Sequence, residues 1–236
     1  MKKSLHRQQK FVEKHSKIGS LFRDFILGGQ DGLVNVLGVI LGIAIATRDP
    51  KIVIIAGLAA TFAESVSMGA VAYTSAKAEE DYYHSQEKVE KTEIETIPAI
   101  EKKEVYDIYY KKGFHGKLLN DIVKNITSNK KRWLDVMMKE ELNLSKEFIN
   151  PIKSAIVVFF AALIGSFIPL TSFFFLSINS AIVLSLIISA IALFITGAIE
   201  AKFTVGNWFK KGLQLSIIGM TAALVGFIVG KLTGYA

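Results

Sequence analysis

The sequence predicts an all-α membrane protein: five transmembrane helices with a cytoplasmic helical insert between the second and the third. Two apolar runs, residues 25–47 and 52–76, hold one charged residue each and are long enough to cross a bilayer as a helix. A charged stretch without any such run follows over residues 77–150. Three more long apolar runs then fill residues 151–236. These observations together predict the five spans and the insert.

The composition of the 236-residue chain fits several spans and one modest soluble portion. Hydrophobic residues make up 51% of the chain, and its formal net charge is +7. Cysteine is absent, which excludes disulfides, thiolate metal sites and cysteine nucleophiles. Much of the basic excess lies beside apolar runs, where it orients a protein in a lipid bilayer. We therefore expect no nucleic-acid partner.

Residues 1–24 form a polar, basic segment ahead of the first span, with seven Lys and Arg residues against two acidic ones. Because basic flanks stay on the cytoplasmic side, we expect the N-terminus and the insert in the cytoplasm and the C-terminus outside. No cleavable signal peptide or targeting extension is evident. This favours a multi-pass protein of a prokaryotic cell membrane, although a vacuolar location would give the same topology.

A single carboxylate stands in each of the first two spans, Asp31 and Glu64. Placing a charge at depth costs at least ~2.5 kcal/mol, so such a residue normally faces a polar pathway rather than lipid. Asn35 follows Asp31 by four residues and Met68 follows Glu64 by four, on the same helical faces. We predict that these four residues line a transport pathway for a desolvated cation. The alternative is that each acid is a protonated packing residue or a dimer contact.

Glycines spaced by four residues are a second feature of the spans. Gly38 and Gly42 lie in the first span, and Gly226 and Gly230 lie in the last. Small residues with this spacing let helix backbones approach closely. We therefore predict tight helix packing, rather than chemistry, at these positions.

Residues 77–150 are expected to form a small helical domain, because acidic and basic residues nearly balance there. Pro98 separates a helix that continues from the second span from one that starts near Ile100. Two further helices are expected at residues 117–128 and 130–142. We expect the aromatic residues to form the core of this domain: Tyr106, Tyr109, Tyr110 and Trp133.

Glutamates spaced by three residues recur on the first two helices of the insert, and the last expected helix adds methionines. The first two helices carry Glu87, Glu90, Glu93, Glu101 and Glu104, and the last carries Met137, Met138, Glu140 and Glu141. Spacing by three puts carboxylates on one helical face, where they can share a cation. Carboxylate oxygens suit divalent cations, and a thioether adds a preference for softer ions such as Fe(II). We predict a metal-binding insert; the alternative is that these glutamates only decorate solvated helix faces.

Three stretches resemble a known family. They are Arg23-Asp24 leading into GGQDGLVN, SMGAVAYTSAKAEED from Ser67, and RWLDVMMKEELNL from Arg132. Together with the order of spans and insert, they make the chain similar to the vacuolar iron transporter family from Arg23 onward. The resemblance implies export of Fe(II) from the cytosol in exchange for protons, with Mn(II) as a second candidate substrate. It also implies a homodimer whose pathway lies between the subunits.

The resemblance further implies roles for individual residues. The family's intramembrane aspartate and methionine match Asp31 and Met68. Its cytoplasmic metal-binding glutamates fall on Glu90, Glu93, Glu101 and Glu104, and its last insert helix places a methionine and a glutamate on or near Met137, Met138, Glu140 and Glu141. Where the family has a Gly-Glu pair after the methionine of the second span, this chain has Ala72-Tyr73. Glu64 is the candidate for the missing carboxylate.

Two other function classes stay open. In the first, the spans only anchor a membrane-bound, storage-like iron-binding protein that transports nothing. The second is an enzyme such as a ferroxidase, for which Asp81-x-x-His84 resembles one copy of a motif that di-iron sites use twice. We predict a transporter rather than an enzyme. Fe(II) or Mn(II) is then a substrate, other divalent metals are further ligands for the insert, and no prosthetic group is expected.

Overall fold

The computed structural model of the protein describes residues 2–145, 150–204 and 206–234, with side chains from residue 19 onward. The described residues are almost entirely helical, and no β-strand occurs among them. The chain divides into two compact units. Residues 1–74 and 149–236 form the first, here called the membrane unit, and residues 75–148 form the second, the insert unit.

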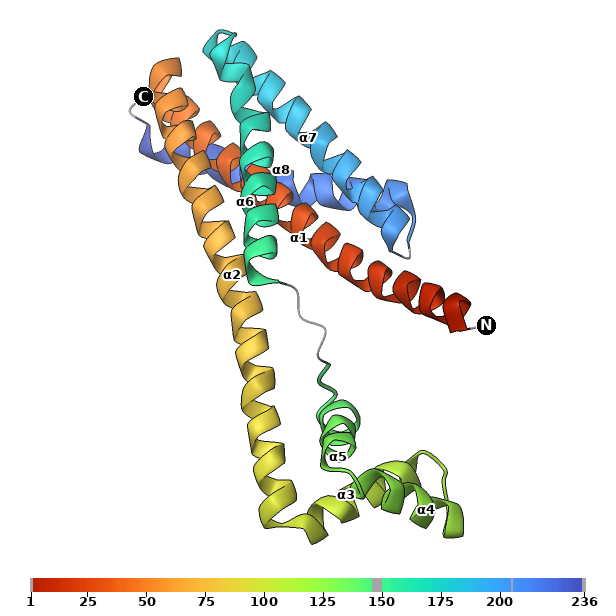
Figure 1. Ribbon diagram of the computed structural model, residues 1–236. Helices are drawn as coiled ribbons and strands as arrows, with labels where there is room; N and C mark the ends of the chain where they lie inside the picture. Colours follow the sequence, from red (N-terminus) through yellow and green to blue (C-terminus); the bar gives the residue numbers. More distant parts are fainter. Residues whose placement is uncertain (1, 146–149, 205, 235–236) are drawn as a thin grey trace. The chain divides into compact units, whose positions relative to one another are not determined.

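Five helices of the described chain are long and apolar enough to cross a membrane, as the sequence predicts. They are labelled in Figure 1: α1 (Lys2–Thr47), α2 (Pro50–Thr96), α6 (Pro151–Leu170), α7 (Ile178–Phe203) and α8 (Trp208–Thr233). A 3₁₀ turn, η2 (Thr171–Phe174), continues α6. α1 is unbroken, so the basic segment expected over residues 1–24 belongs to the same helix as the first span. The apolar part of that helix begins at Gly19.

Helix α1 is the centre of the membrane unit, since it contacts α6, α7 and α8. Two glycine pairs bring it against α8. A Cβ added to Gly226 would overlap the carbonyl oxygen of Gly38, and one added to Gly230 would overlap that of Gly42. The prediction of tight packing at these four glycines is therefore confirmed.

Buried hydroxyls add polar ties between the helices of this unit. Ser154 Oγ on α6 donates a 2.6 Å hydrogen bond to Oδ2 of Asp24, a buried carboxylate of α1. Ser185 Oγ on α7 donates a 2.8 Å hydrogen bond to the carbonyl oxygen of Pro169 on α6. Pro169 cannot donate the helical hydrogen bond to the carbonyl oxygen of Gly165, and α6 gives way to the 3₁₀ turn η2 two residues later.

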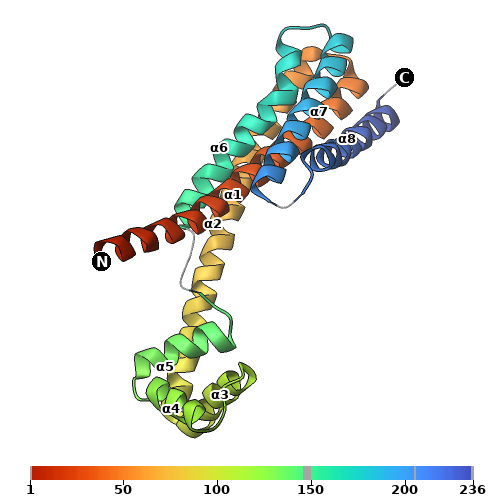
Figure 2. The ribbon, with the colours of Figure 1, turned by 90° about the vertical axis from the view of Figure 1, so that its right-hand side faces the viewer.

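The insert unit combines the C-terminal part of α2 with three short helices and a π-helical turn, and Figure 2 shows the short helices grouped together. These are α3 (Pro98–Lys111), α4 (Gly116–Thr127), α5 (Lys130–Val136) and η1 (Met137–Glu141). Pro98 stands in the first turn of α3, where its missing N–H costs nothing. Asn129 caps α5, because its side chain accepts a hydrogen bond from the backbone N–H of Arg132.

The core of the insert unit contains only part of the aromatic set that the sequence predicts. Trp133 is buried, and Tyr109 packs against the core. Tyr106 and Tyr110 instead stack on each other at the surface, with exposed fractions of 37% and 52%. The prediction was wrong for these two, because Val105 and Tyr109 share the inward face of α3 and the next residues point away from it.

Candidate metal sites

Three polar residues of the first two spans meet in the membrane unit. Asn35 Nδ2 donates one hydrogen bond to Oδ2 of Asp31, at 3.2 Å, and a second to Oε1 of Glu64, at 3.0 Å. The first bond joins successive turns of α1, and the second joins α1 to α2. A single amide thus holds carboxylates from two helices at one point. We call Asp31, Asn35 and Glu64 the membrane triad.

The membrane triad lies at the edge of a groove between α1 and α8. This groove has a volume of about 650 Å³ and is lined by Asn35 and otherwise mostly by glycine and aliphatic residues. Asn35 is exposed, whereas Asp31 and Glu64 are half-buried. Met68, also half-buried, lies one turn further along α2 than Glu64. In a single chain, the membrane triad is therefore accessible from the groove between α1 and α8.

In the insert unit, carboxylates of two helices converge. One oxygen from each of Glu90, Glu93 and Glu101 lies within 4.8 Å of the others. Glu90 and Glu101 are only 5% and 2% exposed, and Oε2 of each is buried without a hydrogen-bond partner among the described residues. Burying an unpaired carboxylate is costly. A divalent cation bound between the carboxylates would remove that cost.

Two more glutamates act on these three through their charge. Burial first, and then the charges of Glu104, Glu90, Glu93 and Glu141, raise the pKa of Glu101 to about 7. Burial likewise raises the pKa of Glu141, together with the charges of Glu104 and Glu93. The five carboxylates therefore form one electrostatic cluster, here called the insert cluster. It favours a cation or bound protons.

The two predicted methionines belong to a π-helical turn rather than to a regular helix. The sequence predicts one helix over residues 130–142, but α5 ends at Val136 and η1 follows it. The N–H of Leu142 bonds to the carbonyl oxygen of Met137 at 3.2 Å, which closes the wider turn. Met137 and Met138 are fully buried in the insert core. Such turns are frequent at functional sites.

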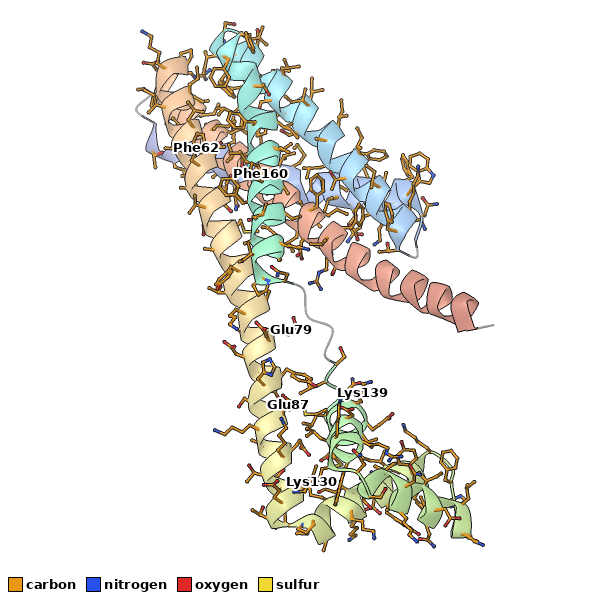
Figure 3. The ribbon with its side chains drawn as sticks, in the orientation of Figure 1. Phe62, Glu79, Glu87, Lys130, Lys139 and Phe160 are labelled. Atoms are coloured by element: carbon orange, nitrogen blue, oxygen red, sulfur yellow. The ribbon has the colours of Figure 1, made fainter. Side chains whose placement is uncertain are left out.

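Two of the predicted carboxylates are engaged elsewhere. Glu87, labelled in Figure 3, forms an ion pair with Lys91 at 3.6 Å on its own helix and a contact with His84 at 3.4 Å. The carboxylate of Glu140 is bound by Nζ of Lys112, beyond the end of α3. Sequence reasoning missed Lys112, which is 28 residues away and carries no local signal.

The chain matches the model of the VIT family over residues 22–231, a range that contains every residue of both sites. It is 32% identical to vacuolar iron transporter 1 of Tulipa gesneriana, over 94% of this chain and 91% of that protein. It is 33% identical to vacuolar iron transporter 1 of Arabidopsis thaliana, over 93% and 89% of the two chains. The vacuolar iron transporter of Plasmodium berghei (strain Anka) is 31% identical, over 98% and 90%.

Proposed function

Because the chain belongs to the VIT family, it is a multi-pass membrane transporter of divalent metal, and we propose that it moves Fe(II) out of the cytosol in exchange for protons. Mn(II) is the second proposed substrate, since it accepts the same oxygen and thioether ligands. The observation that carries the proposal is the membrane triad, in which two carboxylates of neighbouring spans share one amide.

In this proposal the membrane triad binds the metal on its way through the bilayer. The N–H₂ group of Asn35 donates hydrogen bonds to both carboxylates. It occupies the place that a bound cation would take. When the cation enters, rotation of the amide turns its oxygen toward the metal and its N–H₂ group away, because a carboxamide carries acceptor and donors at opposite ends. The thioether of Met68 then adds a preference for a softer ion than Mg(II) or Ca(II).

Exchange for protons follows from the same carboxylates. An ionised Asp31 or Glu64 holds the metal, whereas a protonated one does not. Protons that arrive from the far side of the membrane would therefore release the metal on that side. Rocking of the helices, which opens the site to one side at a time, would complete the cycle.

A homodimer is the proposed working form. One chain offers two carboxylates, one amide and the Met68 thioether on an open groove, which leaves one side of a bound ion uncovered. A second copy across the groove between α1 and α8 would supply a matching set and enclose the pathway. Two-fold symmetry is the commonest way to build such an assembly.

The insert cluster is proposed to capture metal from the cytosol and to raise its concentration near the transporter. Its proposed ligands are Glu90, Glu93, Glu101, Glu104 and Glu141, with thioethers from Met137 and Met138. Glu87 and Glu140 are left out, because basic side chains already bind them.

The basic start of α1 supports a cytosolic N-terminus and insert and a C-terminus on the far side. Movement out of the cytosol is then the same reaction in a cell membrane and in a vacuolar membrane.

Fe(II) uptake into proteoliposomes under a pH gradient tests the proposal. We expect uptake that depends on the gradient and falls at least tenfold with Asp31→Asn. Asp49→Asn changes a carboxylate in the turn between α1 and α2 and is the matched control, which should transport normally. Mn(II) added as a competitor should slow Fe(II) uptake if both ions share the pathway.

The rival functions give different results in the same preparation. A membrane-anchored iron-binding protein would bind Fe(II) without any flux. An enzyme of the ferroxidase class would consume oxygen when Fe(II) is added. Either result would contradict the transport mechanism proposed for the membrane triad.

A further inference from the structure

Adjacent residues of the π-helical turn, Glu140 and Glu141, have different surroundings. Glu141 belongs to the insert cluster, where its charge acts on Glu101. Glu140 accepts a hydrogen bond from Nζ of Lys112 and forms an ion pair with it. Successive residues of a helix point in different directions, so one turn can serve both partners. The turn is thus linked to the end of α3 through Glu140, while Glu141 adds its charge to the insert cluster.

Lys112 is itself held in place. Its backbone N–H donates a 3.2 Å hydrogen bond to the carbonyl oxygen of Ile108, at the end of α3. Its Nζ lies 5.3 Å from the centre of the Tyr109 ring, within the range of a cation–π interaction. Tyr109 packs against the insert core. These contacts hold Lys112 in place at the end of α3. Through Lys112, the π-helical turn is therefore linked to α3.

The two linked elements carry different parts of the insert cluster. α3 contributes Glu101 and Glu104, and η1 contributes Glu141 and the two buried methionines. The distance between α3 and η1 therefore decides whether one cation can reach both sets. The buried methionines hold one face of the π-helical turn in the insert core, and the contact of Glu140 with Lys112 fixes the opposite, exposed face relative to the end of α3.

We propose that the ion pair of Lys112 and Glu140 is a positioning device, which holds the π-helical turn at the spacing from α3 that metal binding requires. It also neutralises Glu140 and so keeps this carboxylate out of the ligand set. Both residues act through Glu141 and the methionines and do not touch the metal. The inference rests on the proposed metal site of the insert.

Mn(II) binding to the full-length protein in detergent tests the inference. Lys112→Met and Glu140→Gln should each weaken binding about three- to tenfold, less than the 10- to 100-fold typical of groups bonded directly to a ligand. The double variant should bind no more weakly than either single one, because both changes remove the same interaction. The exchange Lys112→Glu with Glu140→Lys should restore binding to within about twofold of the unaltered protein. Lys139→Met is the matched control, because Lys139 is an exposed lysine of the same turn (Figure 3).

The X-ray absorption spectrum of bound Mn(II) separates positioning from general stability. At saturating metal, Lys112→Met should reduce the sulfur contribution from Met137 and Met138, while helix content by circular dichroism stays unchanged. Loss of helix content in step with binding would overturn the inference, because the pair would then only support the fold. So would equal binding by all variants. Weaker binding by Glu140→Gln with normal binding by Lys112→Met would also overturn it, since Glu140 would then be a ligand.

A further variant distinguishes failure of the proposed metal site from failure of the positioning role. Glu101→Gln combined with Glu104→Gln removes two carboxylates of the insert cluster and leaves the ion pair of Lys112 and Glu140 in place. This variant should lose the insert's Mn(II) binding. Normal binding would show that the cluster is not the metal site, and would refute the capture step together with the positioning role.

Discussion

Asn35 Nδ2 lies 3.0 Å from Oε1 of Glu64, so an amide of the first span is bonded to a carboxylate of the second. The same nitrogen donates to Asp31, one turn earlier on α1. These two hydrogen bonds from one amide keep carboxylates of two spans at one point. It makes Asn35 the residue that most directly tests the transport site.

Asn35→Leu should reduce Fe(II) flux at least tenfold, because leucine has a similar shape but offers neither donor nor oxygen. Protein yield and helix content should stay normal, since Asn35 is exposed on the groove. Asn179→Leu changes an amide that bonds to Arg48 and provides the control. Normal flux through Asn35→Leu would mean that the amide has no part in the pathway.

The insert unit should become less stable as the pH rises from about 5 to 7 in the absence of metal. The pKa of Glu101 is about 7 in the folded protein, against an ordinary value of 4.5. Between these values the folded state binds more protons than the unfolded state, so the free energy of unfolding falls with rising pH. Hydrogen exchange of the α3 amides in the full-length protein measures this stability. Glu101→Gln should make the dependence shallower, while Glu90, whose pKa burial and then neighbouring charges also raise to about 7, keeps part of it. An equally steep dependence in that variant would exclude Glu101 as a source.

Gly226→Ala should destabilise the membrane unit, because the added Cβ would meet the carbonyl oxygen of Gly38 on α1. Overpacking of this kind typically costs about 1–3 kcal/mol. Thermal unfolding in detergent would detect it as a lower midpoint. Gly19→Ala is the matched control, since no atom lies within 4 Å of its added Cβ. A midpoint that drops equally in both variants would point to a general effect of replacing glycine.

Thr61→Val and Ser185→Ala should change stability in opposite directions. The Thr61 hydroxyl is buried and has no hydrogen-bond partner among the described residues, whereas the Ser185 hydroxyl bonds to Pro169. Removing an unpaired buried hydroxyl relieves a penalty of about 1–3 kcal/mol, and removing a paired one loses about 1 kcal/mol. The thermal midpoint of unfolding should therefore rise in Thr61→Val and fall in Ser185→Ala. A lower midpoint for Thr61→Val would reveal a bonding partner for that hydroxyl.

Much of the architecture could be predicted because its signals are local. A run of apolar residues is enough to cross a bilayer, so the five spans follow from hydropathy alone and are confirmed. Pro98 ends the long helix α2 because its ring is incompatible with a helix interior. The family is also confirmed, since the motifs that carry the resemblance are contiguous. The roles predicted for the individual site residues remain to be tested.

Other features depend on contacts between residues far apart in the sequence. Glu140 and Glu141 are adjacent residues of the same type, and only the fold places Lys112, just after α3, beside Glu140. The π-helical turn at Met137 likewise could not be predicted, because its sequence would fit a regular helix equally well. Tyr106 and Tyr110 are on the surface because the rotation of α3 about its axis is set by what it packs against.

The sequence by itself determined the spans, the break at Pro98 and the helical faces that carry carboxylates, because these depend on hydropathy and on the period of a helix. Only the tertiary structure decided which of those faces meet. Asn35 and Glu64 are 29 residues apart and share a hydrogen bond because α1 and α2 belong to one bundle. Glu90 and Glu101 share a buried site because the chain turns at Pro98 and brings α3 to α2. Helix packing, which no local pattern encodes, brings these groups together.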